Sequence, residues 1–218
     1  MGAHLEATHP RSPVPRRSGR RPVTSRGEIE HVALDLFDRQ GFDTTTVDDI
    51  AGAAGIGRRT VFRYYPSKND IPWGAFDEQL DRMRAVFADL PRDVPVMDGI
   101  RTAVLDFNHV DPAEEPWHRR RLGLILGTPA LQAHSTLRYA AWRQVVADYV
   151  ADRLDVPAES LIPRTVGHAC LGVALAAYEQ WLADGGRETA HTLHDLLDTV
   201  FRALDVELDP EHSRPVPP

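Results

Sequence analysis

The residues from Gly57 to Lys68 combine the side chains that proteins use to read DNA. Although the chain has a net charge of −7, this stretch contains no acidic residue and four basic ones: Arg58, Arg59, Arg63 and Lys68. Arginine donors match the two acceptors that guanine presents in the major groove, and threonine, tyrosine and lysine side chains bind phosphate oxygens. The local reversal of charge therefore indicates a nucleic-acid interface. An ordinary solvated helix face is the less favoured alternative.

Two short helices joined by a tight turn would position these side chains. Thr46 is a good N-cap, and apolar residues follow it at helical spacing (Val47, Ile50, Ala51 and Ala54). Gly55 can end that helix in the left-handed conformation, and a second helix begins after Gly57. On the second helix Val61 and Tyr65 face the core. The residues left for the DNA groove are Arg58, Arg59, Thr60, Phe62, Arg63 and Tyr64.

A helix over residues 25–40 completes a three-helix domain, because it carries an amphipathic stripe of Ile29, Val32, Ala33, Leu36 and Phe37. We expect Gly41 to end it and Phe42 to enter the core. Ser67 is then expected to cap a long fourth helix that joins two domains. Its inward residues would be Ile71, Phe76, Leu80, Met83 and Phe87.

Proline and glycine residues divide the rest of the chain into further helices, expected at about 96–109, 113–127, 130–154, 161–184 and 188–205. Long alternating runs typical of strands are absent from the sequence, so the predicted fold is all-α. The predicted organisation is a basic arm over residues 1–24, a DNA-binding domain over 25–72, an effector-binding and dimerisation domain over 73–206 and a tail over 207–218.

These motifs resemble the N-terminal domain of the TetR family of one-component transcriptional regulators. The resemblance rests on residues 25–40, on 41–51 and on the run Gly-Arg-Arg-Thr-Val-Phe-Arg-Tyr-Tyr-Pro-Ser-Lys that ends at Lys68. It implies that a dimer binds a palindromic double-stranded DNA operator. It also implies phosphate contacts from Thr46, Tyr64 and Lys68, whereas Phe62 replaces a tyrosine of the family and cannot bond a phosphate.

A narrower resemblance, over residues 66–77 with 108–109 and 129–134, is to TetR-type regulators associated with mycofactocin biosynthesis clusters. It implies a repressor that responds to an apolar effector such as a long-chain acyl-CoA. Alternatives are a TetR-type regulator of lipid metabolism, redox metabolism or efflux, or an activator. The candidate ligand-binding residues are Phe107, Trp117, Arg119, Arg120, Arg121, Tyr139, Trp142 and Tyr178. The three consecutive arginines could meet phosphate groups, or they could form a solvated helix face.

The last two helices match the position of the dimer interface in the family. Small residues would permit close approach of helices (Gly167, Ala169, Gly172, Ala174, Ala176 and Ala177), and the following helix supplies an apolar face (Leu193, Leu196, Leu197, Val200, Phe201 and Leu204). The alternative is that these residues only complete the core of one subunit.

Charge and composition favour a cytoplasmic protein that meets DNA along one edge. The first 26 residues hold six arginines and one glutamate, a net charge of +5, so the remainder carries −12. The N-terminus lacks the apolar core of a signal peptide, and the most apolar stretch, residues 165–177, is too short to span a membrane. The one cysteine, Cys170, excludes an internal disulfide.

Other functions have weaker support in the sequence. We find no nucleophile elbow, phosphate loop or zinc-protease motif, so we expect no enzyme activity and no cofactor. His191 and His194 have helical spacing but no further ligand nearby, so we expect no metal site. A DNA-packaging protein would share the basic helix, but it would protect DNA uniformly and not at a discrete palindrome.

Overall fold

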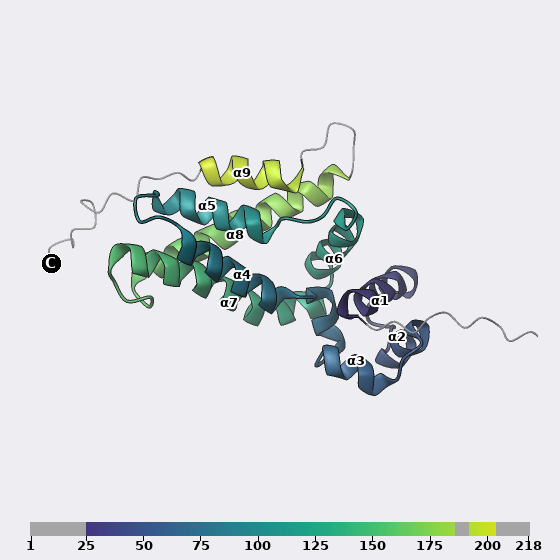
Figure 1. Ribbon diagram of the computed structural model, residues 1–218. Helices are drawn as coiled ribbons and strands as arrows, with labels where there is room; N and C mark the ends of the chain where they lie inside the picture. Colours follow the sequence, from purple (N-terminus) through teal and green to yellow (C-terminus); the bar gives the residue numbers. More distant parts are fainter. Residues whose placement is uncertain (1–24, 186–191, 204–218) are drawn as a thin grey trace, which may run out of the picture.

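The computed structural model describes residues 25–185 and 192–203, and in these ranges the chain is helical without strands. Figure 1 shows a small group of helices at one end of a longer helical body. The elements are α1 (Arg26–Gln40), α2 (Val47–Ala54), α3 (Arg58–Tyr64), the 3-10 helix η1 (Lys68–Trp73), α4 (Phe76–Asp89), α5 (Val96–Phe107), α6 (Glu115–Gly127), α7 (Pro129–Leu154), α8 (Leu161–Asp184) and α9 (Leu193–Ala203). The predicted all-α class is confirmed. The predicted arm, the predicted C-terminal tail and His191 lie outside the described residues.

Local signals in the sequence explain the first three helices. Ser25 and Thr46 each form a capping box, in which the side chain accepts a bond from the backbone three residues later. Gly55 has φ 71° and ψ 27°, the left-handed conformation that ends α2. Val61 and Tyr65 are 1% and 2% exposed, as their spacing predicted.

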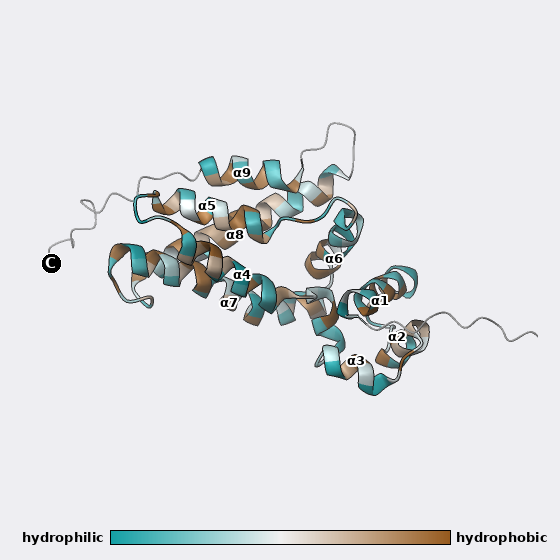
Figure 2. Ribbon diagram, viewed as in Figure 1, coloured by the Kyte–Doolittle hydropathy of each residue, from teal (hydrophilic) through white to brown (hydrophobic). Residues whose placement is uncertain are grey.

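Buried apolar residues form two separate clusters. The smaller cluster contains α1, α2 and α3 side chains with Ile71 and, from the start of α7, Leu131. The larger cluster begins at Trp73 and extends through α4 to α9. Figure 2 shows the hydrophobic residues of α4, α5, α7 and α8 turned toward one another in this body. The chain therefore passes from one core to the other between Ile71 and Trp73.

The prediction of one long fourth helix capped by Ser67 is wrong. The chain instead forms η1, with Pro72 inside it, and then breaks at Gly74 before α4 begins. Gly74 has φ 52°, and a Cβ there would lie 2.7 Å from Oε2 of Glu30. Both the dihedral angle and the close contact require glycine at this position. The residues expected to face inward, from Ile71 to Phe87, are nevertheless buried.

Side-chain ion pairs fasten η1 to α7. Oδ1 of Asp70 lies 3.0 Å from Nε2 of His134 and 3.0 Å from Nη2 of Arg138. Arg138 also pairs with Asp77 at the start of α4, at 2.7 Å. The junction between the two cores is therefore held on one side by α7.

The helix α8 is more apolar than the sequence interpretation allowed. By length and composition alone it could cross a membrane, although only 33% of its most apolar window is buried in the subunit. It packs between α7 and α9, as the core helix of a globular domain does. Its small residues divide into two sets: Ala174 and Ala177 are buried, whereas Ala169, Gly172 and Ala176 are exposed.

Candidate DNA-binding surface and effector cavity

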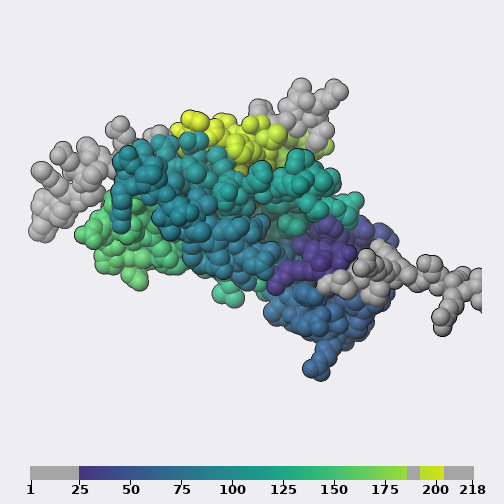
Figure 3. Space-filling view, viewed as in Figure 1, coloured from purple at the N-terminus to yellow at the C-terminus, as the bar shows by residue number. Residues whose placement is uncertain are grey.

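The outer face of α3 presents three arginines around an apolar ring. Arg58, Arg59 and Arg63 are exposed, and Phe62 is 40% exposed. Nη1 of Arg58 lies 2.9 Å from Oδ2 of Asp48, and its guanidinium lies over the Phe62 ring. The structure thus brings together on one surface the side chains predicted to enter the groove. Figure 3 shows that the domain carrying them projects from one end of the body.

The predicted backbone-contacting residues differ in how far their side chains are already engaged. The Thr46 hydroxyl is exposed but accepts from the Asp49 amide and donates to its carboxylate at 2.6 Å. Thr60 and Tyr64 are half-buried, and the Arg63 guanidinium lies 5.1 Å from the centre of the Tyr64 ring. The capping role of Thr46 therefore stabilises α2 whether or not DNA is bound.

Lys68 is placed differently from the sequence expectation of a phosphate contact. Its ammonium donates to the carbonyl oxygens of Phe42 and Thr45 at 2.7 and 2.9 Å, with Asp43 at 3.4 Å. It also lies 4.4 Å from the centre of the Phe42 ring. An ammonium has three donors, and here carbonyls of the loop between α1 and α2 accept from all of them. Lys68 thus braces that loop.

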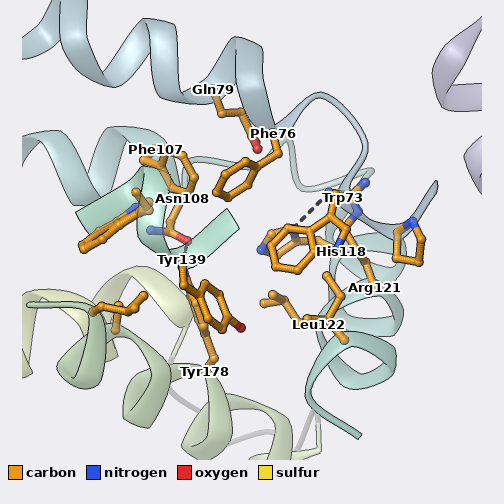
Figure 4. A pocket seen from close by; sticks show the side chains of 15 residues that line it. Trp73, Phe76, Gln79, Phe107, Asn108, His118, Arg121, Leu122, Tyr139 and Tyr178 are labelled. Carbon is orange, nitrogen blue, oxygen red and sulfur yellow. Dashed lines mark hydrogen bonds between the residues drawn. The ribbon is translucent and has the colours of Figure 1, made fainter. Parts of the chain in front are cut away.

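A cavity of about 60 Å³ lies in the larger core, between η1, α4, α5, α6, α7 and α8. Figure 4 shows its aromatic wall, with His118, Arg121 and Leu122 contributed by α6. Five of the candidate ligand residues line it: Phe107, Arg121, Tyr139, Trp142 and Tyr178. The Tyr178 hydroxyl donates to Oδ1 of Asn108 at 2.5 Å, which ties α8 to the end of α5.

The remaining candidate ligand residues do not line this cavity. Trp117 stacks on His31 of α1, with ring centres 4.2 Å apart. Arg119 donates to the carbonyl oxygen of Trp181 at 2.6 Å and lies over its ring. Arg120 pairs with Asp35 and Asp38 of α1 at 3.0 and 3.3 Å. The arginine triplet therefore does not present three free forks to a phosphate group.

Arg121 instead joins the cavity to the DNA-binding domain. Its Nε lies 2.5 Å from Oε1 of Glu30 on α1, a carboxylate that is only 4% exposed. Burial raises the pKa of Glu30, and the charge of Arg121 opposes that rise. Sequence reasoning missed Glu30, although an acidic residue beside Ile29 on the apolar side of an amphipathic helix was a detectable signal.

Several cavity residues were also missed, chiefly Trp73, Phe76, Gln79, Asn108 and His118. Trp73 and Phe76 pack edge to face, with ring centres 5.2 Å apart. They come from the η1–α4 junction, which the sequence analysis treated as one helix joining two domains. No local spacing indicates that this junction forms a cavity wall.

The fold and these two sites define a class of protein, a DNA-binding regulator with a helix-turn-helix and a separate ligand-binding core. Comparison with known proteins agrees with this class. The family model for bacterial regulatory proteins of the tetR family matches residues 29–71, and the model for the MftR C-terminal domain matches residues 94–208. The chain therefore belongs to the TetR family of bacterial transcriptional regulators.

Individual relatives cover most of the chain. A Mycobacterium tuberculosis protein, provisionally named mycofactocin biosynthesis transcriptional regulator MftR, is 44% identical over 87% of this chain and 96% of its own length. The regulator TcmR of Streptomyces glaucescens is 27% identical over 86% of this chain and 84% of its own length.

Solved structures show the same fold. The fatty acid degradation regulator FadR of Bacillus halodurans has a TM-score of 0.61 at 16% identity, covering 83% of this chain and 97% of that one. A TetR-family regulator from Rhodococcus has a TM-score of 0.57 at 18% identity, covering 84% and 98%. At these identities the likeness concerns the fold alone.

Proposed function

We propose that the chain is a dimeric cytoplasmic repressor that binds a palindromic operator and leaves it when an apolar effector enters the cavity. The observation that carries this proposal is the outer face of α3, where Arg59, Phe62 and Arg63 are exposed without an acidic neighbour on the helix. The effector acts by favouring a conformation that binds DNA poorly. The coupling is limited by the difference between its affinities for the two conformations.

Arg59 and Arg63 are the proposed readers of base edges, with Arg58 reading a base or bracing a phosphate. Thr46, Thr60 and Tyr64 position the DNA backbone, and Phe62 meets a thymine methyl or a sugar. Lys68 contributes by shaping the loop before α2, since its donors already bind carbonyls there.

The proposed dimer forms through α8 and α9. Exposed Ala169, Gly172 and Ala176 lie on one side of α8, and no atom lies within 4 Å of a Cβ built on Gly172. Leu161 at the start of α8 is 79% exposed. A second subunit packed on this face would bury it and would set two α3 helices roughly 34–36 Å apart, matching successive major grooves. Sedimentation of a monomer at micromolar concentration would contradict this arrangement.

The proposed target is a mycofactocin biosynthesis cluster, and the proposed effector is an apolar ligand such as a long-chain acyl-CoA. Support comes from the 44% identity to the Mycobacterium tuberculosis protein and from the aromatic cavity. Ligand sites have volumes of about 300–1,000 Å³, so this cavity of about 60 Å³ must widen before an acyl chain enters. That widening would move α6, which contacts α1.

Footprinting on the DNA upstream of the gene and of its neighbours tests the proposal. A discrete palindromic footprint is expected, and a reporter fused to that promoter should rise when the gene is deleted. Uniform protection of all fragments would indicate DNA packaging. A fall in reporter signal on deletion would indicate activation.

A further inference from the structure

The cavity has an unequal polar composition. Its walls are mainly aromatic and aliphatic, and among the described residues that line it none is acidic. The one charged side chain is Arg121, whose positive charge would repel a cationic ligand. A ligand that is an amine or a quaternary ammonium would therefore find no counter-charge on these walls.

Two buried nitrogen atoms on the cavity-lining residues have no hydrogen-bond partner among the described residues. They are Nε1 of Trp73 and Nε2 of His118, and the two residues are 7% and 9% exposed. In Figure 4 the two side chains lie on the side of the cavity formed by η1 and α6, opposite Asn108 and Tyr178. Buried polar groups without a partner are rare in folded proteins, and each one requires an explanation.

Both nitrogens are donors. The indole nitrogen carries a hydrogen and can only donate. Nδ1 of His118 lies 3.5 Å from Nη1 of Arg121, which can only donate, so Nδ1 accepts and the ring hydrogen lies on Nε2. Burial, reinforced by the charge of Arg121, lowers the pKa of His118 to about 4, so the ring is neutral near pH 7. The wall thus presents two N–H groups beside a guanidinium.

We propose that this wall binds the acyl oxygen of an amphipathic ligand, a carboxylate or thioester carbonyl that accepts from Trp73 and His118 while its hydrocarbon chain packs on the aromatic wall. The proposal rests on the proposed function of the cavity as the effector site. It narrows the effector to acceptor-headed amphiphiles and excludes cationic ones.

The same arrangement links the ligand head to the DNA-binding domain. Arg121 lies between the proposed acyl-oxygen site and Glu30 of α1. A ligand oxygen that attracts Arg121 weakens its pairing with Glu30, which is buried beside Gly74. A buried carboxylate that loses its cation is strongly destabilised, so α1 would shift relative to α6.

Calorimetric titration of the full-length protein without DNA tests the proposal. The probes are dodecanoate, dodecanoyl-CoA and dodecyltrimethylammonium, which share a twelve-carbon chain and differ in the head, each used below its micelle-forming concentration. We expect the acyl probes to bind about tenfold or more tightly than the cation. Comparison of dodecanoate with dodecanoyl-CoA distinguishes a free acid from a thioester as the source of the oxygen.

Matched variants isolate the two donors. Trp73→Phe and His118→Phe remove an N–H group but keep a ring, and each should weaken acyl binding about tenfold. Trp117→Phe makes the same change outside the cavity and should leave affinity unchanged. His118→Gln keeps a donor and should retain most of the affinity. Circular dichroism and thermal unfolding verify that every variant is folded.

Three results would overturn the proposal: equal binding of the cationic probe, unchanged acyl binding by both ring-retaining variants, or no acyl binding to the wild-type chain at millimolar concentration. These readouts do not involve DNA. Failure of the protein to footprint any operator would instead overturn the proposed regulatory function, while leaving the acyl site measurable.

Discussion

Glu30 of α1 and Arg121 of α6 form a buried ion pair, with Oε1 and Nε 2.5 Å apart, between residues separated by 91 positions in the chain. The second carboxylate oxygen, Oε2, lies where a side chain on Gly74 would begin. One carboxylate therefore contacts both routes from the effector core to the DNA-binding domain, the η1–α4 junction and α6.

Replacing Arg121 with methionine should lower the free energy of unfolding by about 3–5 kcal/mol at pH 7, because it leaves Glu30 buried without a cation. The double variant Glu30→Met/Arg121→Met should recover much of this loss. Urea unfolding of the four members of the cycle measures the coupling. Arg39→Met, at an exposed ion pair with Asp35, should change stability by less than about 0.5 kcal/mol. A loss at Arg121 no larger than at Arg39 would show that the buried pair is not coupled.

Gly74→Ala should destabilise the protein by about 1–3 kcal/mol, because φ 52° strains an alanine and its Cβ would meet the Glu30 carboxylate. Gly123→Ala is the matched control on α6, where the nearest atom to an added Cβ is 3.9 Å away. That change should stabilise by about 0.5–1 kcal/mol. Thermal unfolding compares the two, and an equal sign for both would contradict the strain at Gly74.

Arg63→Ala should cost about 1–3 kcal/mol of operator binding and relax preference at one base position. The control is Arg82→Ala, an exposed arginine on α4 outside the DNA-binding domain. Electrophoretic mobility shifts with operator variants and with random DNA provide the measurement. Equal losses on both kinds of DNA would assign Arg63 to the backbone and not to a base.

Lys68→Ala should reduce the free energy of unfolding by about 1–3 kcal/mol, since it removes charge-assisted bonds to the carbonyls of Phe42 and Thr45. Hydrogen exchange in the loop between α1 and α2 should rise in parallel. The alternative is a direct phosphate contact. It would appear as unchanged stability with weaker DNA binding and a flatter dependence on salt.

His118 should make stability fall with acid. Its pKa is lowered to about 4 in the folded chain from an ordinary 6.5, so the unfolded chain binds more protons in this window. Stability present above pH 6.5 is then lost as pH falls toward 4, by about 3 kcal/mol in all. Urea unfolding at pH 7 and pH 4.5 should show a smaller loss for His118→Gln than for wild type. His168→Gln, at an exposed histidine, should behave as wild type.

Much of the DNA-binding domain could be read from neighbouring residues. The cap at Thr46, the left-handed Gly55 and the inward Val61 and Tyr65 each depend on the helical period and on one or two adjacent residues. Such signals act over three or four positions, so the sequence displays them directly. The family assignment followed from the same residues.

The break at Gly74 could not be read in this way. Pro72 and Gly74 were visible, but a helix tolerates or kinks at such residues according to what packs against them. Here the deciding contact is Glu30, more than forty residues earlier in the chain. The same holds for Lys68, whose charge suggested DNA and whose donors reach carbonyls about twenty-five residues away.

The amino-acid sequence by itself determined the helical class, the helix-turn-helix and the basic face of α3, because these follow from local propensity and periodic spacing. Only the tertiary structure decided which of Arg119, Arg120 and Arg121 reaches the cavity, and that two N–H groups lie unpaired on its wall. Consecutive residues on a helix point in different directions, so their partners depend on which distant helices pack there.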